Sequence, residues 1–150
     1  MKAKIEHHRM VDALVSTSRI NPEEFAYKTS SNRLKSLSYA LAGWIYMLRR
    51  QKNTRIQGVA SIAMLALAAW LGIEPISWAI LILTITMVWM AEFINAAVEA
   101  AIDLSTSEFH PMAKVGKDVA SAAVLLGVMA SIIIGLVILL PPLLTKLGWG

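Results

Sequence analysis

Residues 75–103 read PISWAILILTITMVWMAEFINAAVEAAID, and this stretch decides the fold of the chain. Its first part, from Pro75 to Ala91, carries no charge, and regularly spaced polar residues follow from Glu92 onward. A bilayer core of about 30 Å requires about 20 helical residues at a rise of about 1.5 Å each. We therefore expect a transmembrane helix over about 76–103, with its acidic residues near one end.

Two further stretches, 56–73 and 119–145, lack Asp, Glu, Lys and Arg throughout. They predict two more spans, over about 56–73 and 119–142, with Pro141-Pro142 closing the last one. The composition agrees, because 57% of the 150 residues are hydrophobic and only 16% are charged, whereas a soluble domain carries roughly 25% charged residues. There is no cysteine, which excludes disulfides, thiolate nucleophiles and iron–sulfur clusters.

Residues 32–52 show a different, amphipathic pattern. Their apolar residues recur mostly at intervals of three or four positions, and basic residues lie among or beside them. The apolar residues are Leu34, Leu37, Leu41, Trp44, Ile45 and Leu48. This pattern predicts a helix lying at the membrane surface, with an ordinary packing helix as the open alternative. Residues 1–31 are expected to form a polar N-terminal extension. The sequence thus predicts an all-α membrane protein whose single domain, residues 32–150, contains one amphipathic surface helix and three transmembrane helices.

The basic residues are concentrated at one end of the chain. Eleven of the 14 Lys and Arg residues lie at or before Arg55, and the other three are Lys114, Lys117 and Lys146. By the positive-inside rule, the N-terminus and the loop at 104–118 face the cytoplasm, and the C-terminus lies outside. We interpret the net charge of +4 as mostly an orientation signal, and we expect no nucleic acid partner.

The strongest functional signal is a row of polar residues within the second span. Glu92, Asn95, Glu99 and Asp103 are separated by three, four and four residues, which places them on one face of a helix. An acidic residue near the bilayer centre costs about 2.5 to 3.5 kcal/mol on insertion scales, so such a residue indicates function by default. Two alternatives remain open: polar glue between helices, and a proton or cation pathway in a small ion-coupled transporter.

The segment after this row favours catalysis. Residues 107–118 read SEFHPMAKVGKD and form a charged cytoplasmic loop that ends where the third span begins. Lys117 and Asp118 therefore meet the same membrane face as Glu99 and Asp103. Carboxylates suit Mg²⁺ and lysines suit phosphate, so the set meets the needs of phosphoryl transfer. The chain has neither a P-loop nor the protein-kinase motifs.

These residues resemble a known family. The ExxNxxxExxxD row from Glu92 to Asp103, followed by Lys117-Asp118, is closely similar to the prokaryotic integral-membrane diacylglycerol kinase family, which includes the undecaprenol kinases. The similarity runs from about residue 32 to 144. It implies an ATP-dependent lipid kinase of the bacterial inner membrane, a homotrimer with active sites shared between subunits. The acceptor it implies is diacylglycerol or undecaprenol, and the sequence does not decide between them.

The resemblance also implies roles for individual residues. Glu92 corresponds to the catalytic base that acts on the lipid hydroxyl, Asn95 helps to shape that lipid site, and Glu99 corresponds to a Mg²⁺ ligand that holds the ATP phosphates. Further positions that match the nucleotide-binding region are Tyr39, Asp103, Glu108, His110, Lys117 and Asp118. For His110, which precedes a proline, a simple role in capping or turning the loop is the alternative.

Two positions depart from the family pattern. Gln51 stands where a second metal-binding Glu is expected, and Gln57 stands where one branch of the family carries another Glu. An amide offers a neutral oxygen and no charge, so we expect weaker Mg²⁺ binding at Gln51. The departures leave a further alternative, a catalytically weakened family member with a structural role in the membrane.

Overall fold

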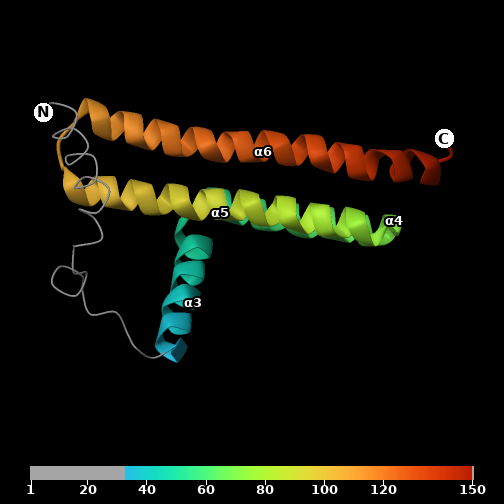
Figure 1. Ribbon diagram of the computed structural model, residues 1–150, viewed down its shortest axis with the longest axis horizontal. Helices are drawn as coiled ribbons and strands as arrows, with labels where there is room; N and C mark the ends of the chain where they lie inside the picture. The colour runs from blue at the N-terminus through green and yellow to red at the C-terminus, as the bar shows by residue number, and fades with distance from the viewer. Residues whose placement is uncertain (1–32, 150) are drawn as a thin grey trace, which may run out of the picture. The chain divides into compact units, whose positions relative to one another are not determined.

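The computed structural model describes residues 33–149, and this part of the chain folds into four helices (Figure 1). They are α3 (Arg33–Arg50), α4 (Lys52–Leu71), α5 (Pro75–Ser105) and α6 (Pro111–Lys146). The described residues contain no strand, so the predicted all-α fold is confirmed over this range. The predicted polar extension at 1–31 lies outside the described residues.

The chain divides into two compact units between residues 42 and 43, and each is considered by itself. In the first unit, α3 exposes Leu34, Leu37 and Leu41, the apolar residues that gave it its amphipathic pattern. An apolar stripe of this kind is what a helix at a membrane surface requires.

The second unit contains three helices that are long and apolar enough to cross a membrane. These are α4 with 20 residues, α5 with 31 and α6 with 36. Most large apolar side chains on them are exposed, for example Leu83, Leu126 and Val137. This exposure suits lipid as the solvent, because lipid tails solvate apolar side chains as well as a protein core does. The prediction of three spans is confirmed.

The third span differs from its predicted bounds at both ends. The helix begins at Pro111, ahead of the uncharged run, because proline at the first helical position needs no N–H partner. It also continues through Pro141 and Pro142 to Lys146. The two prolines remove two backbone hydrogen bonds of the helix. Inside a bilayer there is no water to replace such bonds, so this helix is still lower in free energy than a coil whose backbone groups are all unpaired. The Thr145 hydroxyl donates to the Pro141 carbonyl at 3.2 Å.

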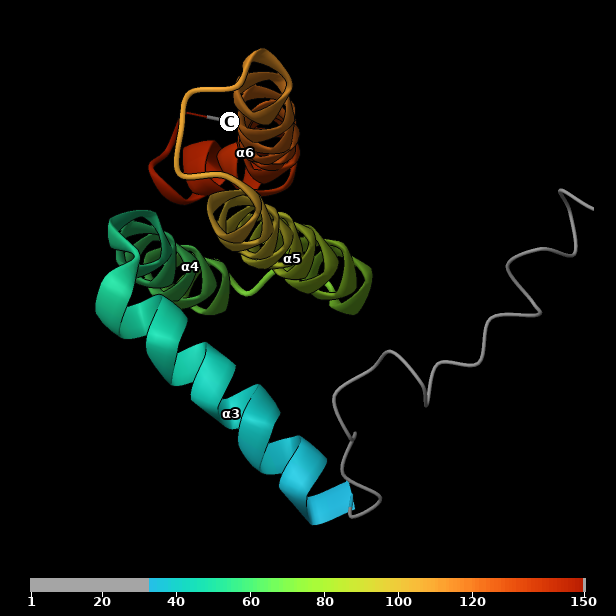
Figure 2. The ribbon, with the colours of Figure 1, turned by 90° about the vertical axis from the view of Figure 1, so that its left-hand side faces the viewer.

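Tight connections set the three helices antiparallel and side by side (Figures 1 and 2). Gly72 closes α4 in the left-handed conformation, with φ of 69°, and its N–H donates to the Ala68 carbonyl at 3.1 Å. Pro75 then begins α5. The loop at 106–110 returns the chain into α6, which packs more extensively on α5 than α4 does.

Small residues of α6 bring it close to its neighbours. A Cβ atom added at Gly116 would lie 2.9 Å from Ile102 Cδ1, and one added at Gly135 would lie 2.8 Å from Met64 Cε. The buried apolar core between the helices is small and centres on Ala68, Leu81 and Leu139. Close backbone approach through small residues is the usual basis of helix association in membranes.

An aromatic cluster packs on the half of α5 that ends at Ser105. Trp44, at the start of the second unit, stacks on Trp89 with ring centres 5.0 Å apart and lies 4.9 Å from the Phe93 ring. The Trp89 indole N–H donates to the Ser61 hydroxyl of α4 at 3.1 Å. This cluster fixes the rotation of α4 and α5 about their axes just beside Glu92.

Candidate active site

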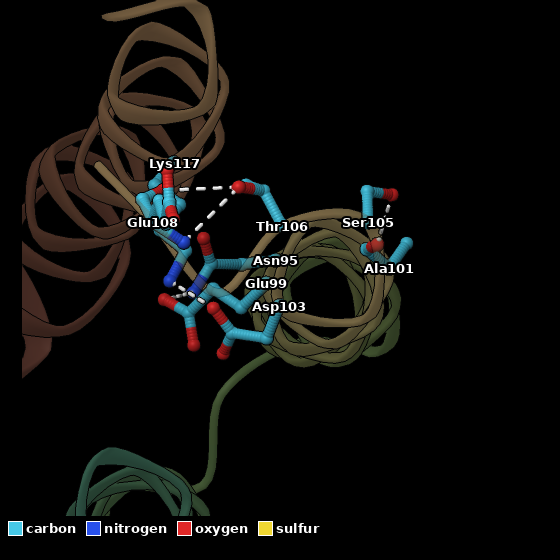
Figure 3. Close-up of polar contacts among 8 residues, drawn as sticks. All are labelled: Asn95, Glu99, Ala101, Asp103, Ser105, Thr106, Glu108 and Lys117. Atoms are coloured by element: carbon cyan, nitrogen blue, oxygen red, sulfur yellow. Dashed lines mark hydrogen bonds and ion pairs between the residues drawn. The ribbon is translucent and has the colours of Figure 1, made fainter. Parts of the chain in front are cut away.

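The polar row predicted within the second span lies on one face of α5 and becomes more exposed toward the end of the helix. Glu92 is only 3% exposed, Asn95 and Glu99 are half-buried, and Asp103 is exposed. Figure 3 shows Asn95, Glu99 and Asp103 on the side of α5 that faces Lys117, with Ser105 on the opposite side. The Asn95 amide donates to Glu99 Oε1 at 3.1 Å. The row therefore runs from a buried carboxyl to an exposed one.

Ion pairs connect the exposed end of this row to the start of α6. Lys117 forms an ion pair with Asp103 across the two helices, and Lys114 pairs with Asp118 one turn along α6. The close approach of α6 at Gly116 brings these side chains within reach of α5. The structure thus places Asp103 of α5 against Lys117 of α6, and Asp118 at the next position of α6, where it pairs with Lys114.

The loop between α5 and α6 is held by its own hydrogen bonds. The Thr106 hydroxyl accepts from the Glu108 N–H at 3.2 Å and donates to the Glu108 carbonyl at 3.0 Å. The His110 ring accepts from the Met112 N–H at 3.2 Å through Nδ1, which caps α6. The capping role considered for His110 is confirmed, and its Nε2 atom and the exposed Glu108 carboxyl are left for a ligand.

Glu92 lies on the wall of a cavity of about 480 Å³ between α4, α5 and α6. The side-chain amide of Asn53 in α4 is within hydrogen-bonding reach of the Glu92 carboxyl, and the charge of Glu99 acts on it from one side. Farther from the loop, the walls become apolar, with Met64, Leu81 and Ile132. The cavity has one polar end at Glu92 and one apolar end, in the size range of roughly 300 to 1,000 Å³ that ligand pockets occupy.

Two further predicted site residues are Gln51 and Tyr39. Gln51 stands at the start of α4, and its side chain makes no capping hydrogen bond there. Tyr39 lies in the first unit, where it is 66% exposed. Its predicted contact with the nucleotide and the predicted metal role of Gln51 stay predictions.

The donor set fits a magnesium ion that arrives with phosphate. The described residues contain no group of three or more His, Cys, Asp and Glu side chains that would cage a metal. Mg²⁺ does not need such a cage, because it is usually held by one or two carboxylates together with phosphates and water. Glu99, with one oxygen bonded to Asn95, can supply such a carboxylate.

Several polar residues of the cavity wall were not predicted as site residues, among them Asn53 and Ser61 of α4. Asn53 reaches Glu92, and Ser61 bonds to Trp89 beside the cavity. Together with Gln57 they form a row at every fourth residue of α4, which is one helix face. That spacing, which begins just before the uncharged run at 56–73 and continues into it, was the available signal.

The fold and the site together define a class of protein: a small multi-pass helical membrane protein in which a row of charges leads from a cavity within the span to a loop outside it. The chain belongs to the prokaryotic diacylglycerol kinase family, whose profile matches residues 38–139. By family it is a lipid kinase and hence a transferase.

Its relatives include proteins named diacylglycerol kinase and a protein named undecaprenol kinase. A diacylglycerol kinase of Synechocystis sp. is 40% identical over 121 residues, which cover 80% of this chain and 69% of that protein. An undecaprenol kinase of Bacillus subtilis is 35% identical over 118 residues, covering 78% and 96%. A diacylglycerol kinase of Escherichia coli is 31% identical over 100 residues, covering 67% and 82%.

Proposed function

We propose that this protein transfers the terminal phosphoryl group of ATP to the primary hydroxyl of a membrane lipid, diacylglycerol or undecaprenol. The observation that carries the proposal is Glu92, which is 3% exposed on the wall of a largely apolar cavity and shares a helix face with the exposed Asp103–Lys117 pair. A lipid hydroxyl in the cavity and a nucleotide phosphate at the loop would meet along this face.

The buried end of the row supplies the acid–base chemistry. Glu92 accepts the proton of the lipid hydroxyl as that oxygen attacks phosphorus, and a base within hydrogen-bonding reach of its proton is the first requirement of such catalysis. Asn53 contacts the Glu92 carboxyl and orients it. Asn95, one turn farther along, holds Glu99 through its amide N–H and shapes the site around the acceptor.

The exposed end of the row supplies the phosphate site. Before ATP binds, Asp103 holds Lys117 in place. When ATP binds, the Lys117 ammonium group turns from Asp103 toward the phosphates, while Asp118 continues to hold Lys114. Glu108 and His110 provide contacts to the rest of the nucleotide. Phosphoryl transfer depends almost entirely on positioning and charge neutralisation, which suits a site made of ion pairs.

Mg²⁺ is the cofactor we propose, held by Glu99 and by the phosphates of ATP. When bound, it would neutralise the phosphate charge that the transfer spreads over the oxygens. Gln51 is a neutral second ligand at most, so this site relies on fewer charged ligands than the family pattern.

The ion-coupled transporter is less well supported. A transport pathway needs polar groups across the full thickness of the membrane. On α5 the charged row ends at Glu92, and the whole stretch from Pro75 to Ala91 carries no charge. A row that stops at a cavity fits a site for one lipid headgroup.

We also propose that the protein works as a homotrimer in the bacterial inner membrane, with its N-terminus and the 106–110 loop in the cytoplasm. Support for association comes from α5, which exposes apolar residues at alternating spacings of four and three along most of its length. This row is Ile76, Ile80, Leu83, Met87, Met90 and Ile94. A four–three repeat is the spacing of a helix–helix seam, and a second copy of α5 would cover it.

A kinase assay tests the proposed function. The purified protein in mixed micelles, supplied with Mg-ATP and either diacylglycerol or undecaprenol, is expected to form the phosphorylated lipid. Glu92→Gln and Glu99→Gln are each expected to reduce kcat by at least about a hundredfold, the lower range for a general acid–base group. Both changes keep the size of the side chain and remove its charge.

Glu74→Gln is the matched control. Glu74 lies just before α5 at the opposite end of the helix, so its loss of charge is expected to leave the rate within about twofold. Absence of a phosphorylated product with both lipids would overturn the proposal and favour the structural role. Equal loss in all three variants would show that charge in general, and not the site, matters.

A further inference from the structure

The cavity beside Glu92 has a polar wall that the proposed reaction does not use. Asn53, Gln57 and Ser61 lie four residues apart on α4, and all three line the cavity. On a helix this spacing stacks the side chains about 6 Å apart along one face. Only Asn53 reaches Glu92, so the other two lie progressively deeper along the path of a bound lipid.

Gln57 has an unmet hydrogen-bonding need. Within residues 33–149, three buried side-chain oxygens have no hydrogen-bond partner: Thr54 Oγ1, Gln57 Oε1 and Asn95 Oδ1. Of these residues, Gln57 is the one that lines the cavity. Leaving a buried polar group unpaired in an apolar medium costs free energy. The unpaired atom is an acceptor as placed, and a half-turn of the amide puts the N–H₂ group there instead, so a ligand that supplies the matching partner is favoured over one that does not.

The other polar side chains of the cavity walls are already engaged. The Thr84 hydroxyl donates to the Ile80 carbonyl at 2.7 Å, and the Ser131 hydroxyl donates to the Val128 carbonyl at 2.8 Å, both within their own helices. Ser61 accepts from Trp89, which leaves its own hydroxyl proton to donate. Apart from Glu92, the free hydrogen-bonding groups of the cavity wall are therefore on α4, at Gln57 and Ser61.

An ester carbonyl of the acceptor lipid matches this wall. A diacylglycerol carries two ester carbonyls within a few bonds of its free hydroxyl, whereas a polyprenol carries no polar atom besides the hydroxyl. An amide has two N–H donors and one oxygen, and a half-turn of its last bond exchanges them. Gln57 can thus turn its N–H₂ group into the cavity, and Ser61 adds a donor one turn deeper.

Resting on the proposed function, we infer that Gln57 is a specificity-determining residue that donates a hydrogen bond to an ester carbonyl of the acceptor lipid and so selects a glycerolipid over a polyprenol. A site built to bond a substrate group discriminates strongly against an analogue that lacks it, because the polar groups of the site are then left unpaired. Glu92 recognises the hydroxyl of the acceptor lipid, and Gln57 recognises the ester carbonyl next to that hydroxyl.

The test compares two lipids of nearly the same shape. Dioleoylglycerol and its diether analogue dioleylglycerol differ in the two ester carbonyls, and undecaprenol is the third acceptor. For the unmodified protein, kcat/KM is expected to be at least about tenfold higher for the diester than for the diether or undecaprenol, the effect of one hydrogen bond of about 1.4 kcal/mol. In Gln57→Leu the diester-to-diether ratio is expected to fall to about one.

Thr84→Val is the matched control, since Thr84 lines the same cavity but bonds its own backbone. It is expected to keep the diester preference. Equal rates for diester and diether in the unmodified protein, a preference for undecaprenol, or an unchanged ratio in Gln57→Leu would each overturn the inference while leaving the kinase intact.

Absence of turnover with every lipid would instead refute the proposed function. Binding then decides the inference separately, because Trp89 lines the cavity. In a variant whose other tryptophans are replaced by Phe, dibrominated diester is expected to quench Trp89 fluorescence at lower concentration than dibrominated diether. Identical quenching curves would overturn the inference.

Discussion

At the scale of single residues, the Asp103–Lys117 ion pair is expected to matter little for stability and more for the proposed function. Their side chains are 66% and 39% exposed, and exposed ion pairs contribute only about 0 to 1 kcal/mol. A pair of so little value for stability costs little to open, as the proposed binding of ATP phosphates requires.

Lys117→Gln is therefore expected to change stability by less than about 1 kcal/mol while raising the KM for ATP at least about tenfold. Thermal unfolding in detergent and initial rates at varied ATP measure the two effects. Lys146→Gln, at the far end of α6, serves as the activity control. A large loss of stability with unchanged KM would show that Lys117 is structural.

The residue scale also shows where sequence reasoning succeeds. The row from Glu92 to Asp103 was predictable, because one helix carries it and its spacing alone defines the face. The contact of Asn53 with Glu92 and the burial of the Gln57 Oε1 atom were not, since they depend on the rotation of α4 against α5. That rotation is set by the aromatic cluster around Trp89, which periodicity does not reveal.

At the scale of elements, the α4–α5 hairpin depends on one backbone conformation. Gly72 has φ of 69° with no atom near the place of a Cβ, so a substitution there is strained by its conformation and not by its neighbours. The left-handed region costs an L-residue roughly 1 to 2 kcal/mol.

Gly72→Ala is accordingly expected to lower the free energy of unfolding by about 1 kcal/mol, measured by thermal or denaturant unfolding in detergent. Gly127→Ala is the matched control, because its Cβ would lie at an ordinary contact distance of 3.8 Å from Val88 Cγ2 in a regular helix. It is expected to be neutral or stabilising. Equal destabilisation by both would refute the turn argument.

The three long helices could be predicted from the lengths of the uncharged stretches. The residues at which they end could not. The prediction ended the last span at Pro141-Pro142, because proline breaks helices in water. In an apolar surrounding the unpaired coil is the costlier state, so α6 continues to Lys146. Element ends depend on the solvent around them, which local sequence does not specify.

At the scale of the whole molecule, the proposed orientation follows from basic residues that lie mostly before α4. A chain without cysteine allows this orientation to be tested with single introduced thiols. Ser107→Cys lies in the α5–α6 loop and Trp149→Cys lies beyond α6, and both positions are exposed.

A membrane-impermeant maleimide is expected to label Trp149→Cys in intact spheroplasts and Ser107→Cys only in inverted vesicles. The unmodified chain provides the blank, because it has no thiol. Labelling of Ser107→Cys from the outer side would contradict the proposed topology, because the proposed ATP site would then face away from the cytoplasm.

The far end of the bundle limits how a lipid reaches the cavity. Lys146 bonds the Trp70 carbonyl at the end of α4, and its ammonium group lies 4.5 Å from the centre of the Trp70 ring. This tie fastens the last turn of α6 to α4 beyond the two prolines. For the proposed kinase, we expect the acceptor lipid to enter between the helices on the Glu92 side of this tie, with its hydroxyl toward the loop. The ends of α4 and α6 are thus held together at Trp70 and Lys146. The proposed route of the acceptor therefore lies at the other end of these two helices, near Glu92.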